Sequence, residues 1–251
     1  MQKCITIAGR RLESAVWDGD PGRRSLVLLH EGLGSVGLWR DFPARLNEAT
    51  GRRVAAFSRF GHGRSEPPPR PRTPAFFHEE ALEVLPDVLA QLGAPEPILV
   101  GHSDGASIAL IHAAQHAVTG IALLAPHVFV EDVTVAAISI ARERYTEGDL
   151  RARMARHHDD VDAAFWGWCD VWLDPRFRAW SLDAEAEQVG CPTLLVQGVE
   201  DPYGTLEQLD RIEARVRGTV TRLEVPGGHS PHLEAAGAVL AALAGFAARL
   251  P

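Results

Sequence analysis

The segment Pro97-Ile98-Leu99-Val100-Gly101-His102-Ser103-Asp104-Gly105 decides the fold, because an apolar run leads directly into a serine flanked by glycines. Residues 97–102 predict a buried strand, and residues 106–116 carry apolar side chains at helical spacing. Between them, the pattern G-x-S-x-G places Ser103 on a tight turn, where glycines let the backbone approach closely and the helix N-terminus favours negative charge. The segment therefore predicts a serine nucleophile at the end of a sheet strand.

Strand and helix patterns alternate along most of the 251 residues. Short runs rich in leucine or β-branched residues predict strands at 4–7, 14–18, 25–30, 53–58, 97–102, 120–125, 193–198 and 221–225. Apolar residues at helical spacing predict helices at 38–48, 78–92, 106–116, 205–217 and 233–249. The middle strands are apolar throughout, as strands covered on both faces should be. We therefore expect an α/β fold with a mostly parallel sheet and helices on both faces.

Two segments interrupt this alternation. Residues 66–74 read Glu-Pro-Pro-Pro-Arg-Pro-Arg-Thr-Pro, and this proline content predicts an extended surface loop. Residues 127–190 show helical patterning and many aromatic side chains, and they are too long for an ordinary connection between two strands. We expect a helical cap at 127–190, inserted in a single core domain formed by residues 1–126 and 191–251.

The composition excludes several classes of protein. With 46% hydrophobic and 23% charged residues, the chain has enough apolar side chains for a substantial core, which excludes a disordered or fibrous protein. A net charge of −8, with arginines scattered singly or in pairs, argues against nucleic acid as a partner. The sequence does not indicate an oligomeric state.

The location of the protein is suggested by its cysteines and its N-terminus. Cys4, Cys169 and Cys191 are too few and too far apart for a disulfide framework or a CxxC zinc site. The first residues lack the apolar stretch of a secretion signal, and no run approaches the roughly 20 apolar residues that span a bilayer. We expect a cytoplasmic protein that does not act at a membrane.

Candidate partners for Ser103 follow two later strands. A serine hydroxyl needs a histidine to take its proton and a carboxylate to orient that histidine. Asp201 follows the strand at 193–198, and His229 follows the last strand. Because loops after neighbouring parallel strands meet at one edge of the sheet, we expect Ser103, Asp201 and His229 to form a catalytic triad. Glu200 and His232 are the nearest alternatives.

The negative charge that develops on the substrate oxygen also needs donors, which are usually backbone amides. The glycine-rich turn at residues 30–35, His-Glu-Gly-Leu-Gly-Ser, follows another strand at the same edge. We expect the N–H groups of Gly32 and Asp104 to form the oxyanion hole.

Taken together, these motifs resemble the α/β-hydrolase superfamily over nearly the whole chain. Residues 30–35 stand at the oxyanion loop of that family, Gly-His-Gly-Arg-Ser at 61–65 at its G-x-G-x-S turn, and residues 101–105 at its nucleophile elbow. Asp201 and His229 match its acid and its base. The resemblance implies an eight-stranded sheet with the second strand antiparallel, and a cap after the sixth strand. Glu31 departs from the family, which usually has glycine after the loop histidine.

Within the superfamily, the sequence Ser103-Asp104-Gly105 is similar to the valacyclovir hydrolases, also called biphenyl-hydrolase-like proteins. In that group the acidic residue after the nucleophile is understood to hold the ammonium group of the substrate, which implies this function for Asp104. A carboxylate beside the reacting carbon would attract cationic acyl groups, and Glu31 would add to the negative charge. The alternative is that Asp104 caps the following helix through its amides.

The cap segment carries a cluster of aromatic residues that includes Trp166, Trp168 and Trp172. Small-molecule sites are mostly apolar, so these three side chains are candidates for lining a substrate pocket. The alternative is that they only pack the cap against the core.

The eleven histidines do not form a recognisable metal site. His157 and His158 are consecutive with two aspartates, so on a helix the four side chains point in different directions, and we expect a solvated face of the cap. No function is assigned to His62 or His127.

The sequence therefore predicts a serine hydrolase without cofactor or metal, which cleaves an ester or related acyl bond of a small molecule through an acyl-enzyme. Two alternatives remain open: a hydrolase of carbon–carbon bonds in a ring-cleavage product, and a ligand-binding protein of the same fold without catalysis.

Overall fold

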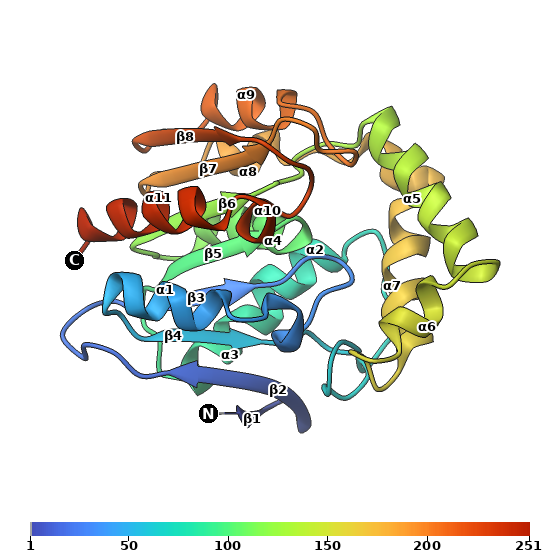
Figure 1. Ribbon diagram of the computed structural model, residues 1–251, viewed down its shortest axis with the longest axis horizontal. Helices are drawn as coiled ribbons and strands as arrows, with labels where there is room; N and C mark the ends of the chain where they lie inside the picture. The colour runs from blue at the N-terminus through green and yellow to red at the C-terminus, as the bar shows by residue number, and fades with distance from the viewer. Residues whose placement is uncertain (1) are drawn as a thin grey trace.

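The computed structural model describes residues 2–251 and contains an eight-stranded sheet (Figure 1). The strands lie in the order β1-β2-β4-β3-β5-β6-β7-β8. Strand β2 runs antiparallel to both of its neighbours, whereas every pair from β4 to β8 is parallel. The expected α/β-hydrolase fold, with its antiparallel second strand, is confirmed.

The strands occupy the predicted places within a few residues at each end. Their bounds are β1 Gln2–Ile7, β2 Arg10–Trp17, β3 Leu26–Leu29, β4 Val54–Phe57, β5 Ile98–His102, β6 Gly120–Leu124, β7 Thr193–Gly198 and β8 Val220–Val225. The agreement follows from burial, because β3 to β7 have no exposed residue and their sequences are therefore mostly apolar.

The helices include two 3-10 segments, η1 and η3, and one π-helical turn, η2. Their bounds are η1 Val36–Trp39, α1 Phe42–Thr50, α2 Phe76–Glu79, η2 Glu80–Val84, α3 Leu85–Leu92, α4 Asp104–Gln115, α5 Asp132–Thr146, α6 Leu150–Met154, α7 Val161–Trp172, η3 Pro175–Ala179, α8 Asp183–Ala186, α9 Glu207–Glu213, α10 Pro231–Glu234 and α11 Ala236–Ala248.

Three predicted helices are interrupted in the structure. The helix expected at 38–48 divides at Arg40, whose φ of 54° ends η1 before α1 begins. The helix expected at 78–92 contains the π turn just before Pro86, which lacks a backbone N–H. The helix expected at 233–249 divides at Ala235. Apolar spacing continues across each of these breaks, so the sequence pattern did not reveal them.

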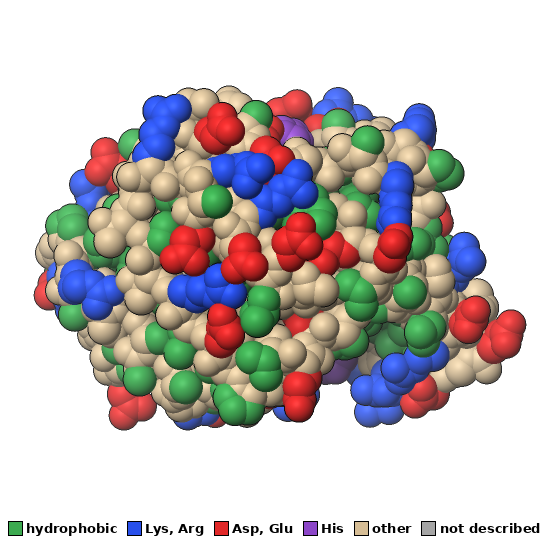
Figure 2. All heavy atoms as spheres, turned by 90° about the horizontal axis from the view of Figure 1, so that it is seen from above, with side chains coloured by type: hydrophobic (Ala, Val, Ile, Leu, Met, Phe, Trp, Pro, Cys, Tyr) green, Lys and Arg blue, Asp and Glu red, His purple; other side chains and the backbone are tan. Residues whose placement is uncertain are grey.

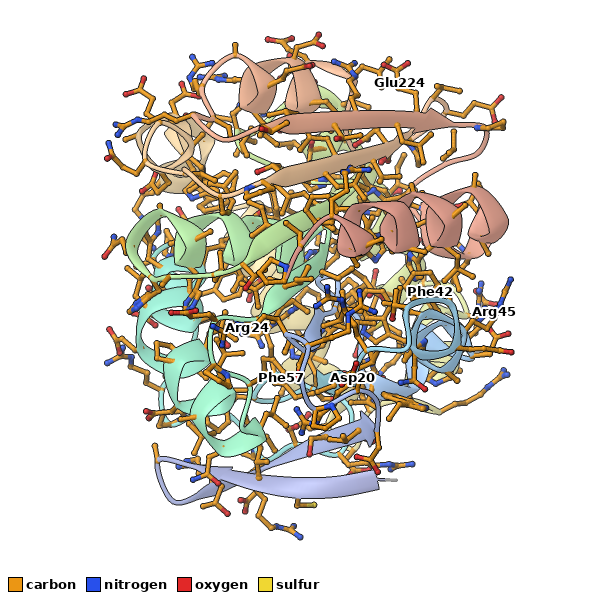
Figure 3. All side chains as sticks on the ribbon, turned by 90° about the vertical axis from the view of Figure 1, so that its left-hand side faces the viewer. Asp20, Arg24, Phe42, Arg45, Phe57 and Glu224 are labelled. Carbon is orange, nitrogen blue, oxygen red and sulfur yellow. The ribbon has the colours of Figure 1, made fainter. Side chains whose placement is uncertain are left out.

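Helices cover both faces of the sheet, because alternate residues of each strand point to opposite sides. Leu26 and Leu28 of β3 face the layer of α1 and α11, whereas Val27 and Leu29 face the layer that includes α2, α3 and α4. Figure 3 shows side chains filling the space between these layers and the sheet. Both faces of the sheet are therefore packed against helices, and the loops at its carboxyl edge start from strands whose position is fixed.

The cap consists of α5, α6, α7 and η3, which stand beyond the carboxyl edge of the sheet (Figure 1). The chain enters and leaves the cap through a neck, where Phe129 and Ser181 form an isolated antiparallel bridge. Helix α8 follows this neck and packs against α4 and α9. The range expected for the cap, 127–190, therefore includes one helix that lies with the core.

The outer surface mixes both signs of charge. Figure 2 shows arginine and carboxylate side chains interspersed with hydrophobic ones on one face of the molecule. None of the helices within residues 2–251 combines the length and apolar character needed to cross a bilayer.

Candidate active site

Ser103 lies on a strained turn between β5 and α4. Its φ of 53° and ψ of −118° are rarely adopted by residues with a side chain. A Cβ atom at Gly101 would overlap the carbonyl of Gly105, and a Cβ atom at Gly105 would overlap the carbonyl of Leu29. Both glycines of the motif are therefore required by close backbone contacts, which hold the serine in this conformation.

His229 and Asp201 join Ser103 in a chain of hydrogen bonds. The Ser103 hydroxyl donates to Nε2 of His229 at 2.9 Å, and Nδ1 of His229 donates to Oδ2 of Asp201 at 2.7 Å. The structure thus brings together three residues that are 126 and 28 positions apart in the sequence. The two alternatives lie elsewhere: Glu200 is exposed, and the ring of His232 is buried against Trp39 and Phe42.

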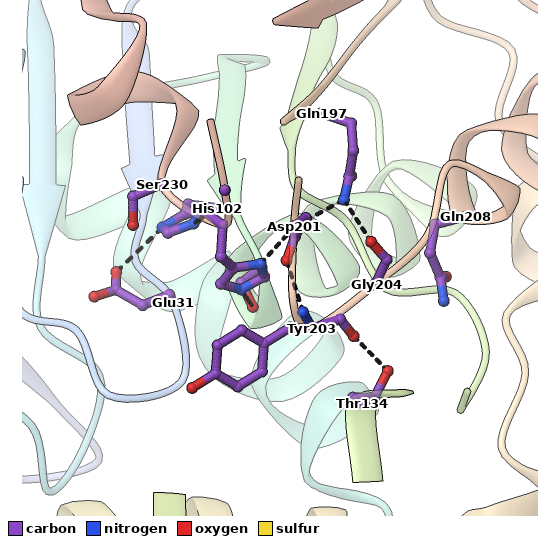
Figure 4. A network of polar contacts seen from close by, with 12 residues as sticks. Glu31, His102, Thr134, Gln197, Asp201, Tyr203, Gly204, Gln208 and Ser230 are labelled. Atoms are coloured by element: carbon purple, nitrogen blue, oxygen red, sulfur yellow. Dashed lines mark hydrogen bonds and ion pairs between the residues drawn. The ribbon is translucent and has the colours of Figure 1, made fainter. Parts of the chain in front are cut away.

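The Asp201 carboxylate is fixed by further donors (Figure 4). Gln197 Nε2 donates to Oδ2 at 2.7 Å, and the backbone N–H of Tyr203 donates to Oδ1 at 2.8 Å. Burial favours the neutral acid, but the hydrogen bond and charge of His229 and the Tyr203 N–H lower the pKa of Asp201 below its usual range. The carboxylate is therefore ionised at neutral pH. Gln197 is not among the residues predicted from the sequence, although its place at the end of β7, two strands' ends from Ser103 at the same sheet edge, was an available signal.

Two buried side chains, Arg59 and His62, hold the oxyanion loop by donating hydrogen bonds to its backbone carbonyl groups. Arg59 donates to the carbonyls of His30 and Glu31, and Nε2 of His62 donates to the carbonyl of Gly32 at 2.8 Å. Within residues 2–251, the N–H groups of Gly32 and Asp104 donate to no protein acceptor. Both predicted oxyanion donors thus remain available beside Ser103.

His158 corrects the expectation of a solvated cap face. Its side chain is buried, accepts from the N–H of Gly63 at 3.0 Å and donates to the carbonyl of Leu33 at 3.0 Å. His62, which had no assigned function, packs against it with ring centroids 5.8 Å apart. Burial lowers the pKa of both histidines, so that neutral rings link the cap, the residue 61–65 turn and the oxyanion loop.

Glu31 lines the pocket, and its carboxylate also lies next to His102 (Figure 4). Its carboxylate lies 3.4 Å from Nδ1 of His102, and Nε2 of His102 donates to the backbone carbonyl of His229 at 2.7 Å. Burial opposes ionisation of Glu31, but the surrounding histidines outweigh it and lower its pKa. Glu31 therefore connects the oxyanion loop to the loop that carries His229.

Asp104 does not cap the elbow helix, so that alternative is wrong: its side chain bonds no backbone amide of α4. Instead, Oδ1 accepts from the indole N–H of Trp172 at 3.1 Å, and Oδ2 is buried without a partner among residues 2–251. Burial raises the pKa of this carboxyl group, while Arg59 opposes the shift. A buried carboxylate oxygen that lacks a donor is costly, and a substrate group that supplies one would relieve the cost.

A small pocket of about 100 Å³ opens at Ser103 between the core and the cap. Its lining includes Glu31, Gly32, Asp104, His127, Ile138, Trp168, Trp172, Tyr203 and His229. Two of the three predicted tryptophans, Trp168 and Trp172, thus face the pocket. Trp166 does not: it lines a separate groove of about 480 Å³ next to Arg72 and the proline-rich loop. The prediction for Trp166 is corrected, because residues 166 and 168 point to different sides of α7.

No group of three or more metal-ligating side chains converges within residues 2–251. The polar side chains at the pocket include the Ser103 hydroxyl, the imidazoles of His127 and His229, and the carboxylates of Glu31 and Asp104. This set is suited to acyl transfer.

The chain belongs to the alpha/beta hydrolase family, whose model matches residues 26–243. It is similar to the human protein "Serine hydrolase BPHL", with 27% identity over 191 residues that cover 72% of this chain and 64% of the relative. The mouse protein of the same name is 26% identical over 84% of this chain and 75% of its own length. The chain thus spans somewhat less than two thirds of the human relative.

Solved structures show the same fold at low identity. An esterase from Exiguobacterium antarcticum superposes with a TM-score of 0.77, at 18% identity over 99% of this chain and 100% of its own. An enol-lactonase from Burkholderia xenovorans LB400 superposes with a TM-score of 0.75, at 19% identity over 97% of this chain and 99% of its own. Together with the family match, these superpositions confirm the α/β-hydrolase fold of the chain.

Proposed function

We propose that the protein hydrolyses carboxylic esters of small molecules through an acyl-enzyme on Ser103. The observation that carries the proposal is the hydrogen-bonded chain from Ser103 through His229 to Asp201, beside two free backbone N–H groups.

The three thiols of the chain are unpaired among the described residues, which supports a reducing, cytoplasmic location.

In the acylation step, Ser103 Oγ attacks the ester carbonyl carbon while its proton passes to Nε2 of His229. The carbonyl π electrons move to oxygen, and the N–H groups of Gly32 and Asp104 stabilise the negative charge. When the intermediate collapses, the bond to the alcohol oxygen breaks and the leaving group takes the proton from His229. The acyl group remains bound to Ser103.

In the deacylation step, a water molecule gives a proton to His229 and attacks the acyl carbon. Collapse of the second intermediate breaks the bond to Ser103 Oγ, which recovers the proton, and releases the carboxylic acid. Asp201 stays ionised throughout and stabilises the imidazolium form of His229. These roles agree with the order of the hydrogen bonds, which run from Ser103 to His229 and from His229 to Asp201.

We further propose that the acyl group carries an amine. The unpartnered Oδ2 of Asp104 lies at the same pocket as Ser103 and would accept an N–H from an ammonium group. The volume of about 100 Å³ supports a short acyl group rather than a long chain.

The test compares two p-nitrophenyl esters with acyl groups of equal size, one neutral and one α-amino. We expect wild-type enzyme to turn over both, to prefer the amino ester, and to be labelled by a fluorophosphonate; Ser103→Ala should abolish turnover and labelling. Ser139→Ala, a change on the cap helix α5, is the matched control and should behave as wild type. Labelling without turnover of any ester would contradict the proposal and favour a binding protein or a carbon–carbon hydrolase.

Asp104→Asn tests the amine preference separately. Loss of the charge should reduce kcat/KM for the amino ester about 10-fold or more, the size of a charge-assisted contact of roughly 1.5–3 kcal/mol. The neutral ester should be little affected. Equal losses for both esters would show that Asp104 supports the elbow instead of binding substrate.

A further inference from the structure

His158 lies where the cap meets two loops of the core. It stands just before α7, and the residue is 3% exposed. Nδ1 accepts from the N–H of Gly63 at 3.0 Å, and Nε2 donates to the carbonyl of Leu33 at 3.0 Å. Because a backbone N–H only donates and a carbonyl only accepts, these two partners require a neutral ring with its proton on Nε2. One side chain thus joins the turn at residues 61–65 to the oxyanion loop.

The turn at Gly63 is a firm anchor for His158. The backbone N–H of Asp159 donates to the Gly63 carbonyl at 2.9 Å, so two consecutive cap residues bind both polar backbone groups of this glycine. On the core side, Oε2 of Glu13 on β2 accepts from the N–H of Arg64 at 3.1 Å. Gly63 has a φ of 56°, and a Cβ atom there would overlap the Glu13 carboxylate. The turn is therefore held by hydrogen bonds and close packing on both sides.

The oxyanion loop depends on bonds to its carbonyl groups because it is rich in glycine. Gly32 and Gly34 flank Leu33, and glycine leaves the backbone free to adopt many conformations. Core side chains bind the carbonyls of residues 30–32, whereas the carbonyl of Leu33 accepts from His158 of the cap. The N–H of Gly32, proposed as an oxyanion donor, belongs to the same short loop. Its direction should therefore depend on the bond between His158 and Leu33.

We propose that His158 is a positioning residue for the oxyanion hole, acting through its hydrogen bond to the Leu33 carbonyl. The proposal rests on the ester hydrolysis proposed above and names a cap residue on which its rate depends. Donors that are already in place stabilise the developing charge without reorganising, so a loop that is free to move loses part of this stabilisation. The lining of the pocket at Ser103 does not include His158, which therefore acts only through the loop.

Two substitutions separate the hydrogen bonds of His158. In His158→Gln, the side-chain amide nitrogen can take the place of Nε2 and keep the bond to Leu33. In His158→Asn, the shorter side chain keeps an acceptor near Gly63 but does not reach Leu33. We expect kcat for p-nitrophenyl acetate to fall about 10-fold in His158→Asn, with little change in KM, and to stay near the wild-type value in His158→Gln. His157→Asn, the same change at the exposed neighbouring residue, is the control.

A second measurement distinguishes positioning from a merely structural contribution. A thionoester carries sulfur in place of the carbonyl oxygen, and sulfur is a weak hydrogen-bond acceptor. The ratio of kcat/KM for an ester to that for its thionoester therefore reports how well the N–H groups act on the developing charge. We expect this ratio to fall about 10-fold in His158→Asn and to keep the wild-type value in His158→Gln. An unchanged ratio in His158→Asn, or equal losses in the two variants, would overturn the proposal.

Fluorophosphonate labelling makes the test independent of the proposed ester hydrolysis. The labelled fraction of each variant counts the molecules with an intact Ser103 site, and rates are expressed per labelled site, so a partly unfolded variant stays informative. The labelling rate also depends on donors to the phosphoryl oxygen. If wild-type enzyme is labelled but hydrolyses no ester, ester hydrolysis is contradicted, while slower labelling of His158→Asn than of His158→Gln would still support the positioning function. Equal labelling rates would contradict it.

Discussion

Single residues decide how the loops around Ser103 are held. Glu31 replaces the glycine that is usual in the family, and its carboxylate pairs with His102, which in turn binds the backbone carbonyl of His229. The carboxylate also lies close to Gly34, where a Cβ atom would overlap it. One side chain thus connects the oxyanion loop to the loop that carries His229.

Glu31→Gln separates this connecting function from the substrate binding that the sequence predicted for Glu31. The carboxylate beside His102 is lost while the side chain keeps its size, so kcat should fall several-fold, by roughly 1 kcal/mol, for amino and neutral esters alike. The ratio of the two kcat/KM values should stay at the wild-type value. A selective loss on the amino ester would show that Glu31 contacts the ammonium group.

At the scale of elements, the cap helix α7 rests directly on the oxyanion loop. The indole of Trp168 occupies the space that a side chain at Gly32 would need, and Trp172, one turn later, bonds Asp104 on the elbow. His158, just before α7, holds the turn at Gly63 and the carbonyl of Leu33. The cap is therefore not a separate lid over the site: it forms one wall of the pocket and fixes the oxyanion loop.

Gly32→Ala tests this contact between elements. The added methyl group would displace either Trp168 or the loop, and with it the N–H proposed for the oxyanion hole. We expect kcat to fall by about 10²–10³, the cost of losing one oxyanion donor, with little change in KM. Gly37→Ala is the matched control, since its nearest neighbour would be the Ser35 hydroxyl at 3.9 Å. Near-normal kcat in Gly32→Ala would show that this amide does not act on the oxyanion.

Several histidines across the molecule are buried, and burial lowers their pKa. Burial lowers the pKa of His30, His62 and His232 well below the usual value, and that of His112 to about 4. The unfolded chain takes up protons on these rings below about pH 6.5, whereas the folded protein does not until the pH approaches the lowered values. The free energy of unfolding should therefore fall as the pH decreases through this range.

His112 allows one such histidine to be measured far from the pocket. It lies on α4, is 2% exposed, and donates from Nδ1 to the carbonyl of Ala81 at 2.8 Å. Between about pH 6.5 and its folded value near 4, it should contribute a decrease of about 1.4 kcal/mol per pH unit. Urea unfolding of His112→Gln at several pH values should show a slope smaller by this amount. Ser139→Ala, on the cap helix α5, changes no titratable group and is the control, which should keep the wild-type slope.

The sequence by itself determined which strands form the buried part of the sheet, and after which strands the candidate catalytic residues stand. Buried parallel strands must be apolar on both faces, which made the strands β3 to β7 visible. A serine nucleophile must sit on a glycine-flanked turn, which made Ser103 the predicted nucleophile. Asp201 and His229 followed because the carboxyl ends of those strands share one edge. These are properties of local patterns and of general sheet geometry.

Only the tertiary structure decided which side chains meet across long separations. His158 binds Gly63, 95 residues away, and His102 binds the carbonyl of His229, 127 residues away. Trp166 and Trp168 share a helix, yet the packing of α7 turns only the second toward Ser103. No local pattern encodes such pairs, since each depends on how the cap and the loops pack together. His127 is of the same kind, because only the packing of the loop after β6 makes it line the pocket beside Ser103.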